Sequence, residues 1–234
     1  GLIRDLKNPM ATRFELRACN PYTNTYLVLA AVYSAVLDGI KAAINHSTEE
    51  LLKELSKNAG EEGFYLEKDR AYRSEEDVFE DYTAEERDKL FGAPPTTVWE
   101  NMQSLEKYPE KVKVITAGGA LREQIIKAFK TGALLRWKTE LIARILPEMR
   151  NIVRSTRKIE SEYRTDQDSY NWNKIKTLRA MLAKDSIDEK SLFTQLINEL
   201  NNENYEEASK LQVEIYSKIE ELKLLYDSYV KNMI

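Results

Sequence analysis

The pattern of hydrophobic and polar positions changes its period near residue 24. Between Thr12 and Arg17 polar and apolar residues alternate, which predicts a short strand with one apolar face. From Tyr26 to Ile44 the chain is almost continuously apolar and rich in alanine, and Asn24 is placed to cap the first helical turn. Because a helix that is hydrophobic on all sides is normally buried, we expect this second segment to be a buried helix.

Helical spacing of apolar residues then recurs through the middle of the chain. Two glutamates shortly after Ser47 predict a helix that starts there, and a further helix is expected from Thr97 to Lys107. After a Gly-Gly pair, apolar residues recur every four positions, at Leu121, Ile125, Phe129, Ala133, Trp137, Leu141 and Ile145. We expect Pro147 to kink or end this helix, because proline cannot donate to the helical hydrogen-bond ladder.

The C-terminal third predicts a helical hairpin or small bundle. Helices are expected within 152–183, at 192–200 and at 205–230, with a turn at 185–188. The last helix carries a seam for partner helices at Ala208, Leu211, Ile215, Ile219, Leu222, Tyr226 and Tyr229. With only 8 glycines and 6 prolines in 234 residues, the chain favours long helices. The expected fold class is mainly α: a helical bundle with long amphipathic helices and a short N-terminal strand.

Charge is spread unevenly along the chain. The net charge of −4 gives no overall basic footprint of the kind that nucleic-acid binding needs. Residues 48–91 carry 7 basic and 15 acidic residues, whereas residues 105–160 carry 13 basic and 6 acidic ones. The basic segment could bind RNA, but a solvated helical face is the commoner meaning of such a pattern, so we expect no nucleic-acid partner.

Cysteine and histidine are too few for several kinds of site. The chain has one cysteine, Cys19, and one histidine, His46, which excludes an intrachain disulfide and a zinc site of the usual ligands. The longest apolar run, Tyr26 to Leu37, is shorter than the ~20 apolar residues of a membrane span. We therefore expect no membrane partner and a cytoplasmic location.

The candidate functional side chains lie on the predicted strand. Arg13, Glu15 and Arg17 share one face, so a carboxylate lies between two guanidinium groups. Guanidinium groups bind phosphate and carboxylate in a bidentate fashion, and a carboxylate beside phosphates can hold Mg²⁺. A lone Arg-x-Glu-x-Arg is more often an exposed strand face whose charges neutralise one another. The neighbouring sequence has to decide between such a face and a site for phosphate and metal.

The longer pattern resembles glutamine synthetase. The Arg13-x-Glu15-x-Arg17 motif is followed at matching spacing by Asn24-x-Tyr26-Leu27 and then by Leu37-Asp38-Gly39-Ile40. In that family the first motif ends a strand of the active-site barrel, and the second and third begin and end a buried helix. Two departures are Thr25, where the family has proline, and Ala18-Cys19-Asn20, where it has x-Pro-Asp; neither removes an assigned chemical group.

The resemblance implies a role for each residue of the motif. Arg13 would contact ATP phosphate, Glu15 would bind a metal near the nucleotide phosphates, and Arg17 would contact glutamate and the phosphoryl group in transfer. The implied reaction uses ATP with Mg²⁺ or Mn²⁺ to activate the glutamate side chain as an acyl phosphate, which ammonia then attacks. A homo-oligomer is also implied. The helices after residue 150 resemble the long, type-three branch of the family.

Three regions are expected on this basis. Residues 1–45 would end the catalytic domain, residues 46–150 would continue it as helices with an acidic insert, and residues 151–234 would form a C-terminal hairpin or bundle. Only twelve residues precede Arg13, so we expect a C-terminal fragment of a ligase that is inactive by itself. The alternatives are a non-catalytic helical module for assembly or partner binding, derived from a ligase, and an RNA-binding bundle.

Overall fold

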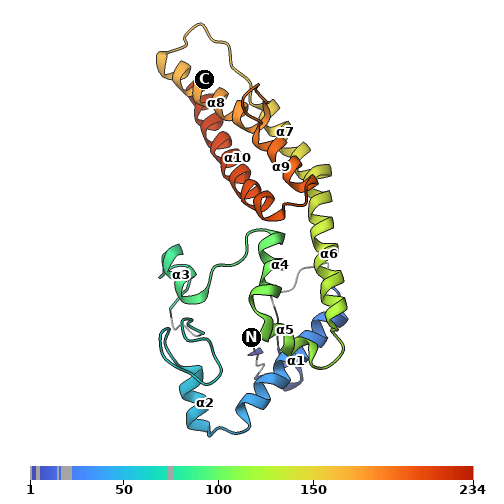
Figure 1. The fold of residues 1–234 in the computed structure, drawn as a ribbon. Coiled ribbons are helices and arrows are strands. Elements are labelled where there is room, and N and C mark those ends of the chain that lie inside the picture. The colour runs from blue at the N-terminus through green and yellow to red at the C-terminus, as the bar shows by residue number, and fades with distance from the viewer. Residues whose placement is uncertain (1, 4–5, 15, 17–22, 73–75, 234) are drawn as a thin grey trace.

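Helices make up most of the part of the chain that the structure describes. This computed structural model describes residues 2–3, 6–14, 16, 23–72 and 76–233 (Figure 1). The helices are α1 (Thr25–Ala43), α2 (Thr48–Leu55), α3 (Ala84–Phe91), α4 (Val98–Lys107), α5 (Pro109–Thr116), α6 (Glu123–Glu140), α7 (Leu146–Ser155), α8 (Asp166–Ala183), α9 (Leu192–Asn201) and α10 (Tyr205–Met233). The predicted helical bundle is therefore confirmed.

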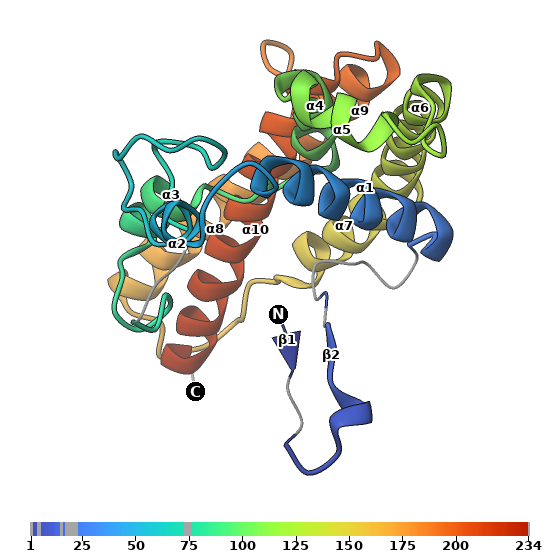
Figure 2. The ribbon, with the colours of Figure 1, turned by 90° about the horizontal axis from the view of Figure 1, so that it is seen from below.

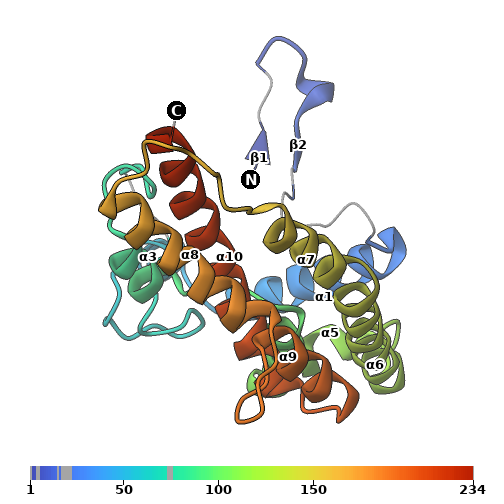
Figure 3. The same cartoon turned by 90° about the horizontal axis from the view of Figure 1, so that it is seen from above.

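Extended structure is confined to a short N-terminal hairpin among the described residues. Strand β1 (Leu2–Ile3) pairs antiparallel with β2 (Arg13–Phe14), with Ile3 opposite Arg13, and a 3-10 turn at Pro9–Ala11 lies between them. Figures 2 and 3 show this hairpin projecting away from the helices. A pair of two-residue strands has little independent stability, because each lacks further neighbours to complete its hydrogen bonds.

One apolar core holds the C-terminal helices together. α10 packs against α4, α7, α8 and α9, and Figure 1 shows α7 to α10 gathered in one body, which α6 joins to the N-terminal helices. Every buried apolar side chain of the described residues lies between Met102 and Tyr229. Six of the seven predicted seam residues of α10 are buried, and Tyr226 is half-buried. The core includes both Met149 and Val153, on either side of the predicted domain boundary at 150, which stays a prediction.

Pro147 does not end the helix in which it lies. A π-helical turn, η2 (Leu141–Ile145), separates α6 from α7, and Pro147 falls in the first turn of α7. The backbone N–H of Leu146 donates to the carbonyl of Leu141, five residues earlier. The wider turn lets the helix pass the missing proline N–H, since a π-turn shifts the hydrogen-bond partners by one residue.

The predicted burial of α1 is wrong within this chain. The helix forms where expected, but no residue in it is buried, and Tyr26 and Tyr33 are 84% and 70% exposed. Among the described elements its main partner is α5, which covers one side. Thr25–Ala43 is also long and apolar enough to cross a membrane by length and composition, with a mean hydropathy of 1.5. The apolar run Tyr26 to Leu37 is shorter than this helix, so that run alone does not indicate the property.

Part of the predicted stripe on α6 is likewise uncovered. Trp137 and Leu141 are buried, whereas Phe129 is 56% exposed. α4 covers part of α6, and α10 reaches only its C-terminal half, where the indole of Trp137 bonds Gln212. A second difference is α5, a helix not predicted from the sequence, which begins at Pro109 soon after the helix expected from Thr97 to Lys107 ends. Proline is well accommodated in a first turn because its missing N–H would have no helical partner there.

Candidate functional site

The structure describes one of the three predicted site residues. Arg13 is exposed on β2, and its guanidinium donates a hydrogen bond to the carbonyl of Ala11 at 3.3 Å. Glu15 and Arg17 lie outside the described residues. Arg13 is therefore exposed to solvent, and the roles of Arg13, Glu15 and Arg17 all stay predictions.

The start of α1 follows the local rules that the sequence indicated. The side-chain oxygen of Asn24 accepts hydrogen bonds from the backbone N–H groups of Tyr26 and Leu27, at 3.1 and 3.2 Å. Thr25 is the first residue of the helix. At that position an N–H has no helical partner, so threonine and proline are both tolerated. The departure from proline at residue 25 thus leaves the entry to α1 intact.

The end of α1 is tied to the loop that follows α2. The hydroxyl of Tyr65 donates to Asp38 at 2.9 Å. Burial and then this bond to the carboxylate raise the pKa of Tyr65 above its ordinary value. Asp38 belongs to the Leu-Asp-Gly-Ile segment of the motif. The contact therefore joins the motif to residues 57–72 as one local unit.

Glu54 holds that loop through its backbone N–H groups. Its buried carboxylate accepts hydrogen bonds from the backbone N–H groups of Phe64, Tyr65 and Leu66, at 2.8, 3.0 and 2.6 Å. Burial acts to raise the pKa of Glu54, but these three bonds together with the charge of Lys57 lower it overall. Gly63 allows the close approach, since a Cβ there would lie 2.5 Å from the carboxylate oxygens.

Lys57 binds the backbone carbonyls of the same loop, whereas Glu54 binds its N–H groups. Its buried ammonium donates to the carbonyls of Glu61, Glu67 and Lys68, at 3.3, 2.5 and 3.3 Å. From the sequence, Glu54 and Lys57 are only two of the charged residues within 48–91, and no pattern assigns either a role. Gly60 and Gly63 are the local sign of a tight loop. They do not indicate which charged side chain binds the backbone of that loop.

The described residues do not supply a complete metal site. No group of three or more His, Cys, Asp or Glu side chains is close enough together to hold a metal ion in that part of the chain. Divalent cations such as Mg²⁺ take several oxygen ligands, and Glu15 could provide one. The described donor set does not fit such an ion by itself, so we derive no chemical step through a metal.

Comparison with known proteins assigns the N-terminal segment. Residues 2–68 match the family model described as glutamine synthetase, catalytic domain. No curated protein and no solved structure matches the chain. The matched segment contains the motif residues, α1, α2 and most of the loop that Glu54 and Lys57 organise, and it ends well before α3. Residues 2–68, about 29% of the chain, are therefore similar to a segment of a glutamine synthetase catalytic domain, a family of ligases.

Proposed function

We propose that the chain is the C-terminal part of an ATP-dependent glutamate–ammonia ligase that forms glutamine through a glutamyl phosphate. The family match over residues 2–68 carries this proposal. The spacing of Arg13, Glu15 and Arg17 ahead of an Asn24-capped helix supports it. ATP, glutamate and ammonia are the proposed substrates, with Mg²⁺ or Mn²⁺ held by the complete domain.

The charges of the motif suit the proposed reaction. Negative charge accumulates on a phosphoryl group in transfer, and fixed cationic donors stabilise it. In this proposal Arg13 holds an ATP phosphate, and Arg17 holds glutamate and the transferring phosphoryl group. Glu15 contributes one oxygen ligand to a cation whose other ligands come from elsewhere. A metal in such a site neutralises phosphate charge when bound.

The uncovered face of α1 fits a helix that packs inside a larger domain. Tyr26, Tyr33 and Ile40 are all more than half exposed on it. A core helix of a soluble protein and a membrane helix pass the same test of length and hydropathy. Because the family match includes α1, we propose that the rest of a catalytic domain covers this face, in a cytoplasmic homo-oligomer.

The test uses a protein that contains this chain together with a complete catalytic domain. We expect glutamine formation that requires ATP, ammonia and Mg²⁺ or Mn²⁺, and a fall in kcat of about 100-fold or more in Arg17→Ala. The control is Arg154→Ala, at an exposed arginine of α7, which should keep full activity. Absence of glutamine formation, or full activity in Arg17→Ala, would contradict the proposal.

The isolated chain gives a second, independent measurement. Calorimetric titration with Mg-ATP should detect no binding that depends on Arg13 or Glu15, because the described residues hold no group of side chains that could complete a metal site beside the motif. Micromolar binding that disappears in Arg13→Ala and Glu15→Ala would instead show that the motif works alone. That outcome would refute the inactive-fragment part of the proposal but would support the assigned roles.

A second candidate is a non-catalytic helical module derived from a ligase. The observation that favours it is that all buried apolar side chains of the described residues lie after residue 101, outside the family match. The C-terminal helices can then fold without the matched segment. Failure of glutamine formation in an otherwise folded, oligomeric protein would favour this candidate.

A further inference from the structure

A cationic concavity lies along α8, far along the chain from the matched segment. Its volume is about 540 Å³, within the range of pockets that hold small molecules. Four cations line it, namely Lys158, Arg164, Lys176 and Arg179. No acidic side chain is part of the lining within the described residues. Because like charges repel, this arrangement is relieved by a ligand that carries more than one negative charge.

Several of these cations retain hydrogen-bonding capacity. Lys176 makes no hydrogen bond or ion pair with the part of the chain that the structure describes, and Asn173 beside it has a side-chain amide without a described partner. Lys158 pairs at 3.1 Å with Glu160, whose side chain is 81% exposed. An exposed pair of this kind contributes little, so Lys158 can turn to a ligand at small cost.

Hydrogen bonds fix the backbone that forms one wall of the concavity. The hydroxyl of Tyr226 bonds to both the N–H and the carbonyl of Arg157, at 3.2 and 3.1 Å. The hydroxyl of Tyr229 does the same with Ile159, at 3.1 and 3.3 Å. These four bonds fix the backbone on each side of Lys158 against α10. They hold the Lys158 backbone at the rim of the concavity.

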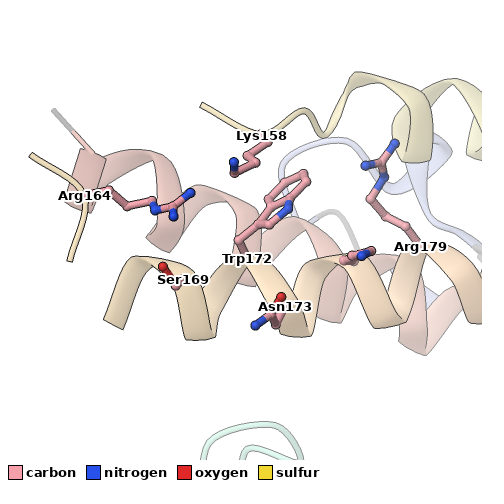
Figure 4. Close-up of a pocket in the computed structure, with 7 residues that line it drawn as sticks. Lys158, Arg164, Ser169, Trp172, Asn173 and Arg179 are labelled. Carbon is pink, nitrogen blue, oxygen red and sulfur yellow. The ribbon is translucent and has the colours of Figure 1, made fainter. Parts of the chain in front are cut away.

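Trp172 forms the centre of the lining. Its ring packs against Tyr229, with centroids 5.5 Å apart, and the Arg179 guanidinium carbon lies 5.8 Å from its centroid. Figure 4 shows the indole of Trp172 between the side chains of Lys158 and Arg179. The guanidinium of Arg179 is also fixed by a bond from its Nε to the carbonyl of Val153 at 3.0 Å. The remaining N–H groups of Arg179 stay available as donors.

Asp168, an acidic residue on the first turn of α8, does not neutralise these charges fully. One oxygen of Asp168 accepts from the N–H and the hydroxyl of Thr165, at 2.9 and 2.7 Å. This carboxylate is occupied in capping the helix. Asp168 stays charged and interacts with Arg164. Asp168 and Glu160 together set two negative charges against the four cations, so the concavity keeps a net charge of about +2 for a ligand.

From this geometry we infer that the concavity between α8 and the segment 156–164 binds a small molecule with two or more phosphate groups. Guanidinium and ammonium groups are the usual partners of phosphate oxygens, and four of them match a diphosphate better than a single anion. Inorganic pyrophosphate and a nucleoside diphosphate share this chemistry. The ring of Trp172 gives a nucleotide one further surface to contact.

The test is calorimetric titration of the whole chain with pyrophosphate, ADP and adenosine in a low-salt buffer. Wild type should bind pyrophosphate and should not bind adenosine. Lys176→Gln should weaken binding about fivefold, and Lys158→Gln combined with it more than tenfold. Lys174→Gln is the matched control, since Lys174 lies on the same helix over the Tyr170 ring and outside the concavity. Its affinity should stay within about twofold of wild type.

Two further arms separate this site from other phosphate-binding groups. Arg13→Ala and Arg17→Ala should leave pyrophosphate binding unchanged, so failure here is distinguishable from failure of the proposed ligase function. Tighter binding of ADP than of pyrophosphate, with loss of the difference in Trp172→Leu, identifies a nucleotide. Equal affinities identify the phosphates alone. Absence of pyrophosphate binding, equal weakening in Lys174→Gln, or binding of only a long oligonucleotide would overturn the inference.

Discussion

Glu54→Gln offers a sharp test of how the loop after α2 is held. The carboxylate accepts three backbone hydrogen bonds, two at Oε1 and one at Oε2. Glutamine keeps one oxygen, which can retain the bonds from Tyr65 and Leu66. Its NH₂ group then faces the N–H of Phe64, so two donors meet. The two side chains are nearly the same size, so the substitution removes the negative charge and one acceptor oxygen without changing the packing.

The size of the effect follows from the three bonds. A hydrogen bond to a charged group contributes roughly 1.5–3 kcal/mol, a neutral one roughly 0.5–1.5, and an unsatisfied buried N–H costs roughly 1–3 kcal/mol. Two weakened bonds and one lost bond therefore give a local destabilisation of about 3–5 kcal/mol. Three kcal/mol corresponds to a change of about 100-fold in an opening equilibrium.

The assay is hydrogen exchange at the amides of residues 64–66. We expect their protection factors at pH 7 to fall by about 100-fold in Glu54→Gln. The control is Glu62→Gln, in the same loop, where the acid is 77% exposed and pairs with Lys68. If protection in Glu54→Gln matched that of wild type, or if both variants lost it equally, the assigned role of Glu54 would be wrong.

The same carboxylate predicts a dependence on pH. The pKa of Glu54 is lowered from its ordinary value of 4.5, so its contribution is fully present above that value. The contribution is lost as pH falls through the lowered pKa in the folded protein. Protection factors at residues 64–66 of wild type should therefore decrease in strongly acidic solution, whereas those of Glu54→Gln should lack this step.

Two further predictions concern the C-terminal core. Leu222→Ala removes a fully buried side chain and should lower the free energy of unfolding by about 2–5 kcal/mol in a urea titration; a similar loss in Leu224→Ala, at a residue 71% exposed, would show that the core is misassigned. Gln212→Leu leaves the indole N–H of Trp137 without its acceptor at 2.8 Å, and should cost about 1–3 kcal/mol by thermal unfolding. An unchanged Tm would mean that this bond is not formed in solution.

Local patterns in the sequence were sufficient for most helices and for the family resemblance of residues 2–68. The helix expected at 205–230 is α10, Tyr205–Met233, and the helix expected from Thr97 is α4. Asn24 and Ser47 cap α1 and α2 as predicted. These features could be predicted because helical periodicity and capping depend on residues only three or four positions apart.

Tertiary structure decided which apolar surfaces are covered and where charges gather. The sequence of α1 indicates a buried helix, yet burial requires partner elements, and α5 is its main partner in the described chain. The role of Glu54 depends on a loop ten to twelve residues away that folds back onto it. The cationic concavity depends on Tyr226 and Tyr229 fixing a segment some seventy residues earlier in the chain. Local periodicity does not predict such contacts. The partners are far apart in sequence, and they come together only when the intervening chain has folded.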